Sequence, residues 1–145
     1  DLMNQHAQLL GMKSSNFENP HGLPSANHYT TARDMATLAQ AIVTEFTEQY
    51  KIYSEELFTY DNIKQGTRDA LLWREPTVDG LKTGYTESAG FCLVSSAKKD
   101  DMRLISVVMG AKSDQARMRE SQKLLSYGFR YYKTLKLYNA NDIVT

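Results

Sequence analysis

The sequence predicts a domain of the α/β (α+β) class, in which helices flank an antiparallel sheet. Three strand-like segments follow one another between residues 80 and 110, with only short turns between them. Such short connections are typical of antiparallel neighbours, because parallel strands need a long crossover. Helical periodicity precedes this stretch over residues 31–46 and follows it over residues 113–132. We therefore expect helices packed on a three-stranded antiparallel meander.

Composition fits one globular domain and argues against several kinds of partner. The chain has 145 residues, of which 41% are hydrophobic and 23% charged, and its formal net charge is zero. No basic excess favours nucleic acid, and no apolar run approaches the length of a membrane span. The lone cysteine, Cys92, excludes an internal disulfide and is expected to be a buried strand residue. The three histidines share no helix-face spacing, so we expect no metal site and no cofactor.

Residues 1–30 predict the end of a helix followed by a long loop. Apolar residues recur at helical spacing over residues 1–12, with Gly11 near the end. Residues 13–30 are rich in Ser, Asn, Pro, Gly and His, and residues 19–22 predict a turn. Long loops are often functional. No serine or aspartate framework surrounds His21, so we expect this histidine to order the loop through hydrogen bonds.

A second helix is predicted to start at Thr31, with Asp34 three positions on as a variant of the capping box. Its apolar stripe consists of Met35, Leu38, Ala39, Ile42 and Phe46. A shorter helical piece follows around Tyr50, and residues 57–60 predict a short strand. Residues 62–74 predict a polar loop, pinned to the body of the protein by Leu71, Leu72 and Trp73.

Lys82, Thr83 and Gly84 form a Lys-Thr-Gly triplet on a predicted strand edge. Lysine supplies charge at long reach, threonine donates a directional hydrogen bond, and glycine lets a substrate backbone lie flat. Together they predict a ledge that binds a carboxylate. Average residue usage gives such a triplet by chance in about three of a hundred chains of this length. An ordinary strand beside a turn is therefore the alternative, and the setting of the triplet decides between the two.

The segments after this ledge complete the predicted sheet and add a helix. Residues 91–97 are apolar on both faces, as in a strand buried on both sides, and residues 102–109 return after a turn. Ser113 is expected to cap a long helix. The expected inner face of this helix comprises Met118, Ser121, Leu125, Gly128, Phe129 and Tyr132. The small residues on that face would let the helix lie close to the sheet. From Thr134 onward the chain is expected to be extended.

Five segments, taken in chain order, resemble a known family. They are residues 21–23 (His-Gly-Leu), 32–36 (Ala-Arg-Asp-Met-Ala), 71–73 (Leu-Leu-Trp), 78–90 and 124–130. They resemble the low-molecular-mass penicillin-binding proteins, more narrowly the D-alanyl-D-alanine carboxypeptidases of the penicillin-binding protein 5 and 6 type. The resemblance implies a β-lactamase/D,D-peptidase-like fold. It also implies that residues 1–135 are the C-terminal portion of that domain, and that residues 136–145 exit toward a second, β-rich domain.

That family uses three motifs, and only the Lys-Thr-Gly motif is present here. Two Ser-x-x-Lys strings begin at Ser95 and Ser96, but they lie on a predicted strand, where residues three apart point to opposite faces. Two Ser-x-Asn strings begin at Ser14 and Ser25, downstream of where the family carries that motif. The resemblance therefore implies that the nucleophile belongs to a segment before Asp1, and we expect this chain alone to be inactive.

The resemblance implies a role for each residue of the ledge. Lys82 would hold positive potential over the site and bridge the missing motifs. Thr83 would hydrogen-bond the terminal carboxylate of the substrate, while Gly84 clears room for it. The backbone N–H of Tyr85 would be one of two oxyanion donors.

Three residues outside the ledge also match the family. Arg117 matches an arginine that helps to bind the substrate carboxylate, with a solvent-exposed surface arginine as the alternative. Arg68 matches a second arginine beside the site, for which structural and functional roles are both open. Leu23 is expected to line the pocket near the D-alanine methyl group.

The activity implied by the resemblance is that of a serine-type D-alanyl-D-alanine carboxypeptidase, a hydrolase that trims peptidoglycan stem peptides and binds β-lactam antibiotics. Strand 102–109 would be an exposed apolar edge. We therefore expect a partner in the missing N-terminal segment or in a strand-exchanged copy. The implied location is periplasmic, with inner-membrane attachment through a segment outside this chain left open. A serine β-lactamase and a non-catalytic scaffold module are the alternatives. The first needs a water-activating residue that the chain does not show.

Overall fold

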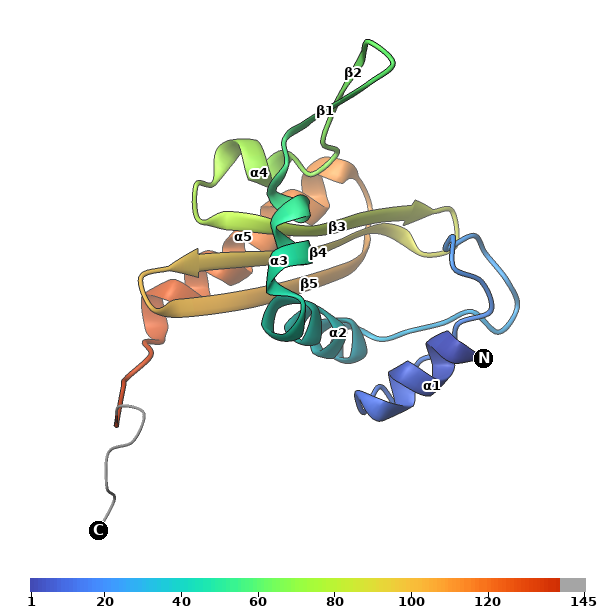
Figure 1. The fold of residues 1–145 in the computed structure, drawn as a ribbon, viewed down its shortest axis with the longest axis horizontal. Coiled ribbons are helices and arrows are strands. Elements are labelled where there is room, and N and C mark those ends of the chain that lie inside the picture. The colour runs from blue at the N-terminus through green and yellow to red at the C-terminus, as the bar shows by residue number, and fades with distance from the viewer. Residues whose placement is uncertain (139–145) are drawn as a thin grey trace.

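A three-stranded antiparallel sheet forms the centre of the structure (Figure 1). The computed structural model describes residues 1–138. Strand β3 (Val78–Thr86) pairs with β4 (Gly90–Lys99), and β4 pairs with β5 (Met102–Ala111). The predicted meander is therefore confirmed. Within the described residues, β3 and β5 are the two edges of this sheet.

Strand β4 is buried on both faces, as its apolar sequence predicts. Residues 93–97 are all buried, and Ser95 and Ser96 have no exposed surface. Lys98 and Lys99, by contrast, are exposed at the end of the strand. The Ser-x-x-Lys strings therefore cannot act as nucleophile and base. The prediction that Cys92 is a buried strand residue is wrong in its burial. The residue is only half-buried, and its thiol lies 3.5 Å from the carbonyl oxygen of Ala89.

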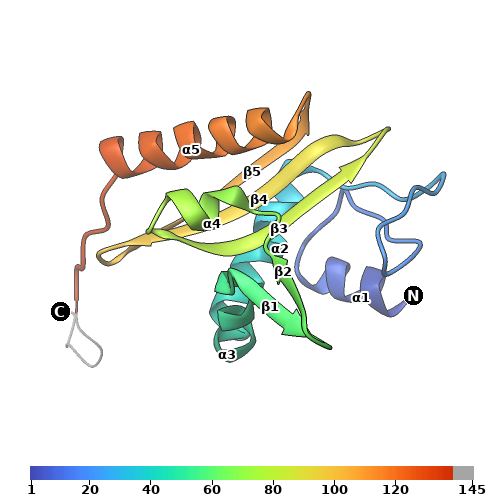
Figure 2. The same ribbon diagram turned by 90° about the horizontal axis from the view of Figure 1, so that it is seen from above.

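Helix α5 (Asp114–Tyr131) covers one face of the sheet, as Figure 2 shows. Ser113 caps it by accepting a hydrogen bond from the N–H of Ala116 at 3.1 Å. The core between helix and sheet consists of Leu71, Leu72, Val78, Leu93, Ala97, Met118 and Leu125. Gly128 allows close packing, because a Cβ there would lie 2.5 Å from Leu104 Cδ1. Tyr132 is not on the inner face as expected, since the helix ends one residue earlier and this side chain is exposed.

Helix α2 (Ala32–Glu45) packs against the other face and also anchors the preceding loop. Thr31 Oγ1 accepts from the N–H of Asp34 at 3.2 Å, as the capping pattern predicts. The buried carboxylate of Asp34 accepts from Ser14 N at 2.9 Å and from Ser15 Oγ at 2.6 Å. Phe46 was expected on the apolar stripe, but it follows the last helical residue and is exposed.

The N-terminal helix α1 (Leu2–Leu9) is tied to the long loop by reciprocal hydrogen bonds. Asn4 Nδ2 donates to the carbonyl of Phe17 at 2.9 Å, and Phe17 N donates to Asn4 Oδ1 at 2.7 Å. Within the loop, His21 Nδ1 accepts from Leu23 N at 3.2 Å, so the expected ordering role of this histidine is confirmed. The loop is thus held at both ends before it reaches the sheet.

A polar cluster joins three segments on the α2 side of the sheet. Both terminal nitrogens of Arg103 donate to the carboxylate of Asp79 at 2.7 Å. Tyr50 is the last residue of helix α3 (Thr47–Tyr50), which the 3₁₀ helix η1 (Lys51–Ser54) follows, and its hydroxyl donates to the same carboxylate at 2.6 Å. Burial, reinforced by this bond, raises the pKa of Tyr50 above its usual value. The charge of Arg103, near the start of β5, is thus paired inside this cluster.

The segment between η1 and β3 differs most from expectation. Strand β1 (Leu57–Tyr60) is confirmed, but it pairs with β2 (Ile63–Gly66), which was expected to be loop. This hairpin projects from the body, and every one of its strand residues is exposed (Figure 1). Helix α4 (Ala70–Arg74) was also expected to be loop. It buries Leu71 and Leu72 but leaves Trp73 half exposed, so only the two leucines pin this segment.

The C-terminal segment adds no further element among the described residues. Residues 132–138 have no regular secondary structure, and most of the expected exit segment, residues 136–145, lies outside the described part. In residues 1–138, no helix is both long and apolar enough to cross a bilayer.

Replacing Gly80 by alanine tests the packing of η1 on the sheet. A Cβ at Gly80 would lie 2.8 Å from the hydroxyl of Tyr50 and 3.2 Å from Tyr53 Cβ. We expect Gly80→Ala to lower the free energy of unfolding by about 1–3 kcal/mol, because overpacking forces these groups apart. Urea unfolding of the protein that includes the preceding segment measures the effect. The control is Gly66→Ala, where nothing lies within 4 Å, and equal stability of both variants would contradict the packing described.

Candidate active site

A cavity of about 640 Å³ lies between the second half of β3 and the long loop. Ligand sites commonly have volumes of about 300–1,000 Å³. Every residue predicted to form the site lines this one cavity: Leu23, Arg68, Lys82, Thr83, Gly84, Tyr85 and Arg117. The structure thus brings together three cations, a hydroxyl and a glycine from four separate parts of the chain.

The side chains of β3 alternate between the two faces of the sheet. Thr83 lies opposite Leu93, whose side chain packs in the core under α5. Since neighbouring strand residues point to opposite faces, Thr83 shares the α5 face and Lys82 points to the other one. Arg117 also comes from α5. A hydroxyl and a guanidinium that could hold a carboxylate therefore lie on the same face.

The edge position of β3 leaves part of its backbone available to a ligand. Every second residue of an edge strand directs its N–H and C=O away from the sheet. An extended peptide can therefore add to this edge as a further strand. Lys82 is exposed beside it, with Nζ donating to the carbonyl of Thr83.

Gly84 has open space where a side chain would lie. A Cβ built there would meet only Cys92 Cβ, at 4.0 Å, which is ordinary van der Waals contact. Packing within the chain therefore does not require glycine at this position. This contrasts with Gly80, whose neighbours leave no room for a side chain. Gly84 also lines the cavity, so a side chain there would occupy space beside it.

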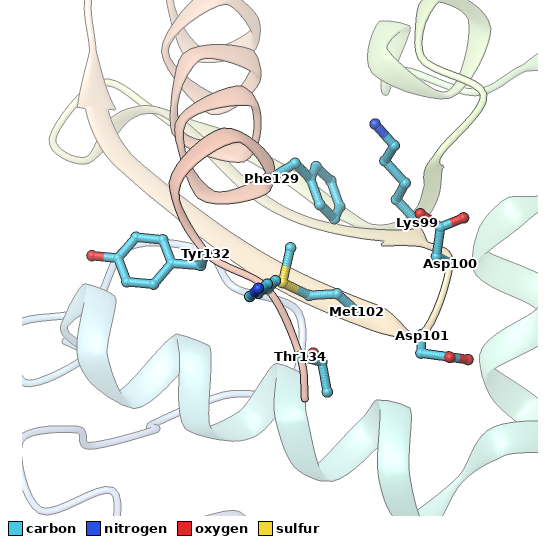
Figure 3. A pocket seen from close by; sticks show the side chains of 8 residues that line it. Lys99, Asp100, Asp101, Met102, Phe129, Tyr132 and Thr134 are labelled. Atoms are coloured by element: carbon cyan, nitrogen blue, oxygen red, sulfur yellow. The ribbon is translucent and has the colours of Figure 1, made fainter. Parts of the chain in front are cut away.

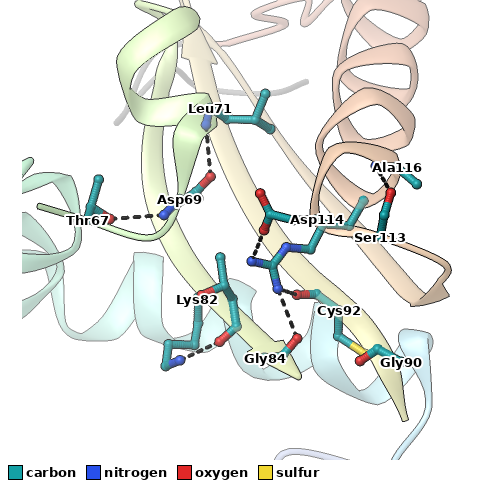
Figure 4. A network of polar contacts seen from close by, with 12 residues as sticks. Thr67, Asp69, Leu71, Lys82, Gly84, Gly90, Cys92, Ser113, Asp114 and Ala116 are labelled. Carbon is teal, nitrogen blue, oxygen red and sulfur yellow. Dashed lines mark hydrogen bonds and ion pairs between the residues drawn. The ribbon is translucent and has the colours of Figure 1, made fainter. Parts of the chain in front are cut away.

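Arg117 is buried, so the alternative of a solvent-exposed surface arginine is wrong. Only 5% of the residue is exposed. Its Nη1 donates to the carbonyls of Gly84 at 3.0 Å and Cys92 at 3.2 Å, and its Nη2 pairs with Asp114. The three acceptors, Gly84, Cys92 and Asp114, are labelled in Figure 4. Arg117 thus ties α5 to both β3 and β4 and places positive charge at the floor of the cavity.

A buried carboxylate, Asp69, lies beside this arginine and was not found from the sequence. Its Oδ1 caps α4 by accepting from Leu71 N at 3.0 Å, whereas Oδ2 has no hydrogen-bond partner among the described residues. Burial raises the pKa of Asp69, and the neighbouring charge of Arg117 partly opposes that shift. The aspartate before the apolar pair Leu71-Leu72 could have predicted the cap, but not its burial beside Arg117.

The remaining site residues sit at the rim of the cavity. Arg68 is exposed at the end of the segment that follows the β1–β2 hairpin. Leu23 is 61% exposed on the loop side. Neither is held by the core, so both can adjust to a ligand.

Two other features of the described residues are relevant as candidate sites. In residues 1–138, no three His, Cys, Asp or Glu side chains are placed to hold a metal ion. A smaller cavity of about 260 Å³ lies where the β4–β5 turn meets the end of α5 (Figure 3). Its walls include Asp100, Asp101 and Phe129, and it contains none of the predicted site residues. It lies at the opposite end of the sheet from the ledge.

Comparison with known proteins agrees with this geometry. The model of the peptidase S11 family, D-alanyl-D-alanine carboxypeptidase, matches residues 1–113. The chain belongs to the D-alanyl-D-alanine carboxypeptidase family. The D-alanyl-D-alanine carboxypeptidase DacC of Escherichia coli K12 is 48% identical to it over 135 residues, which are 92% of this chain and 34% of that protein.

Solved structures of carboxypeptidase-family relatives show the same fold. Penicillin-binding protein 5 of Haemophilus influenzae superposes with a TM-score of 0.86 at 50% identity, covering 89% of this chain and 38% of that one. Penicillin-binding protein D2 of Listeria monocytogenes, in its cefotaxime-bound form, gives 0.82 at 31% identity and covers 88% and 53%. The D,D-peptidase-like fold is therefore confirmed. The chain spans little more than a third of the length of the first two relatives.

Asp69→Asn tests the electrostatic cost of the carboxylate beside Arg117. The folded pKa of Asp69 lies above its ordinary value of 3.8, so the folded state holds the proton more tightly than the unfolded state. Stability from this group is present below pH 3.8 and is lost as the pH rises through the folded pKa. Asparagine also caps helices and does not titrate. We expect the variant to gain free energy of unfolding, relative to the parent, between about pH 4 and pH 7.

Urea unfolding of the protein that includes the preceding segment, across that pH range, measures the gain. The matched control, Asp101→Asn, removes an exposed carboxylate from the β4–β5 turn. A difference between Asp69→Asn and the parent that stays constant with pH would show that burial of the Asp69 charge has no net cost.

Proposed function

We propose that the chain supplies the Lys-Thr-Gly strand of a serine-type D-alanyl-D-alanine carboxypeptidase. The enzyme would remove the terminal D-alanine from peptidoglycan stem peptides and would bind β-lactam antibiotics. The observation that carries the proposal is the single cavity lined by the edge of β3, by Arg68 and Arg117, and by Leu23. The relative with cefotaxime bound supports the antibiotic part, since its fold matches this chain.

The geometry supports a distinct role for each group. Thr83 and Arg117 lie on one face of β3, where the terminal carboxylate of the peptide would bind, and Arg68 adds charge at the rim. Lys82, on the other face, would hold positive potential over the reacting centre. The backbone N–H of Tyr85 would stabilise the oxyanion, and loss of one such donor typically costs about 3 kcal/mol.

The proposed reaction needs a serine that this chain does not contribute. The serine oxygen would attack the penultimate D-alanine carbonyl while a lysine takes its proton. The C–N bond then breaks, and the leaving D-alanine amine takes up a proton. Water hydrolyses the resulting acyl-enzyme and regenerates the serine. Slow hydrolysis of a penicillin adduct would distinguish this enzyme from a serine β-lactamase.

The cellular location and the domain arrangement of the enzyme are also part of this proposal, and the similarity to the carboxypeptidase family supports them. It would act on the cell wall in the periplasm, and attachment to the inner membrane would require a segment outside this chain. Residues 1–135 would form the C-terminal portion of the catalytic domain, and residues 136–145 would lead toward a second domain.

Thr83→Val tests the proposed carboxylate contact in the protein that includes the preceding catalytic segment. We expect kcat/KM for D-alanine release from a D-alanyl-D-alanine peptide to fall about 10- to 100-fold, because a hydrogen bond to a charged group is lost. Thr59→Val, on the exposed hairpin, is the control. Thermal melting should change little for either variant. A loss of stability as large as the loss of activity would favour a purely structural threonine.

Arg117→Ala would test the carboxylate contact less clearly than Thr83→Val. Because the guanidinium is buried and bonds to β3 and β4, its removal should lower both activity and stability. Thr83→Val removes no such bonds between α5 and the strands, so it separates an effect on activity from an effect on stability better.

The exposed edge of β5 predicts a partner strand. Its apolar residues, Leu104, Ile105, Val107, Val108 and Met109, have no proline and no inward charge among them to discourage pairing. We expect this chain to be stable only together with its N-terminal segment, as a second polypeptide or by strand exchange with another copy. Gel filtration and native mass spectrometry measure the assembly. A folded monomer whose amides 102–109 exchange freely, with nothing bound, would refute this expectation.

A further inference from the structure

Three side chains form a stack that runs from α5 to the lip of the cavity. Tyr85 and Phe91 lie directly opposite each other in β3 and β4, with ring centroids 4.3 Å apart and ring planes at 34°. The guanidinium of Arg117 lies over the Phe91 ring, 5.6 Å from its centroid. The order from inside to outside is therefore Arg117, Phe91 and Tyr85.

The inner members of this stack hold the outer ring in place. Arg117 is buried and bonded to the carbonyls of Gly84 and Cys92, and Phe91 is half-buried above it. Offset or tilted aromatic pairs at this separation add about 0.5–1.5 kcal/mol to area burial. Tyr85 is nevertheless 57% exposed and lines the cavity. It thus offers an aromatic surface on the β3 side of the cavity, next to the charged and hydroxyl groups of the ledge.

The position of the Tyr85 ring relative to Thr83 determines which part of a bound ligand the ring would contact. The two residues share a face of β3 and are two positions apart, which is about 7 Å along a strand. A ligand with its carboxylate at Thr83 and Arg117, extended along β3, would bring the group two residues further on to Tyr85. In a β-lactam, the corresponding group is the acyl side chain. Leu23 lines the same cavity from the loop and adds apolar surface.

We propose that the Tyr85 ring, supported by Phe91, is a specificity-determining surface that binds flat apolar groups on the acyl side of the ligand. The inference rests on the proposed function and assigns the side chain a role separate from that of its backbone N–H. The hydroxyl is not needed for this contact, because stacking uses the face of the ring. Tyr85→Phe should therefore keep the preference, and Tyr85→Ala should lose it.

The test compares two penicillins on the protein that includes the preceding catalytic segment. Benzylpenicillin carries a phenylacetyl side chain, whereas 6-aminopenicillanic acid has none. The readout is the ratio of their second-order acylation rates, followed by mass spectrometry. We expect Tyr85→Ala to lower the ratio about tenfold, because one aromatic contact is lost. Tyr85→Phe should keep the parent ratio, and so should the control Tyr60→Ala, which removes an exposed tyrosine from the hairpin.

The ratio separates recognition from general damage. A Tyr85→Ala variant that reacts more slowly with both penicillins to the same extent, or not at all, would overturn the inference, as would an unchanged ratio. Phe91→Leu provides a second measurement, since loss of the supporting ring should also lower the ratio. A parent protein acylated by neither penicillin would overturn the proposed function, and the inference with it.

Discussion

The buried guanidinium of Arg117 fixes the end of the sheet on which the site depends. Taking a charge out of water is costly unless acceptors surround it. Here two backbone carbonyls and the carboxylate of Asp114 accept from the two terminal nitrogens, whereas the buried Nε has no partner among the described residues. Because the carbonyls belong to Gly84 and Cys92, the same bonds that satisfy the charge hold β3, β4 and α5 together. The position of the ledge therefore follows from the requirement that a buried cation be solvated by protein.

A second cluster of charged groups holds the elements on the opposite face of the sheet in place. Arg103 and Asp79 form a two-point ion pair that Tyr50 completes, joining the end of α3 to the beginning of β3 and to β5. The sheet is thus fixed by one polar cluster on each face. The apolar core lies on one of these faces, between the sheet and α5. Such clusters specify geometry more sharply than apolar contact does, since each bond has a direction.

Local sequence signals predicted the long elements correctly. The caps Thr31 and Ser113, with regular apolar spacing, located α2 and α5, and the apolar run of residues 91–97 located the central strand. The same signals failed where elements are short and polar, as in β2 and α4, because too few residues repeat to define a period. Phe46 and Tyr132 were misplaced for a related reason. In both cases the apolar spacing in the sequence continues beyond the last helical residue. Only the capping geometry determines where the helix ends.

The site was predictable in its residues but not in their environment. The Lys-Thr-Gly triplet is local, and a family resemblance was needed to add Leu23, Arg68 and Arg117 to it. The burial of Arg117 could not be inferred, because its acceptors lie 33 and 25 positions away in the chain. Asp69 beside it and Phe91 beneath Tyr85 were missed because their roles arise only when α4, α5 and two strands meet.

The open space beside Gly84 determines which kind of selection acts on this position. Since a methyl group there would touch only Cys92 at an ordinary distance, folding places no demand on the residue. In the proposed enzyme, selection on this residue would therefore act through ligand binding. A side chain there would narrow the cavity for a β-lactam and for the peptide substrate alike, so resistance through this residue would be limited by loss of the proposed activity and not by misfolding.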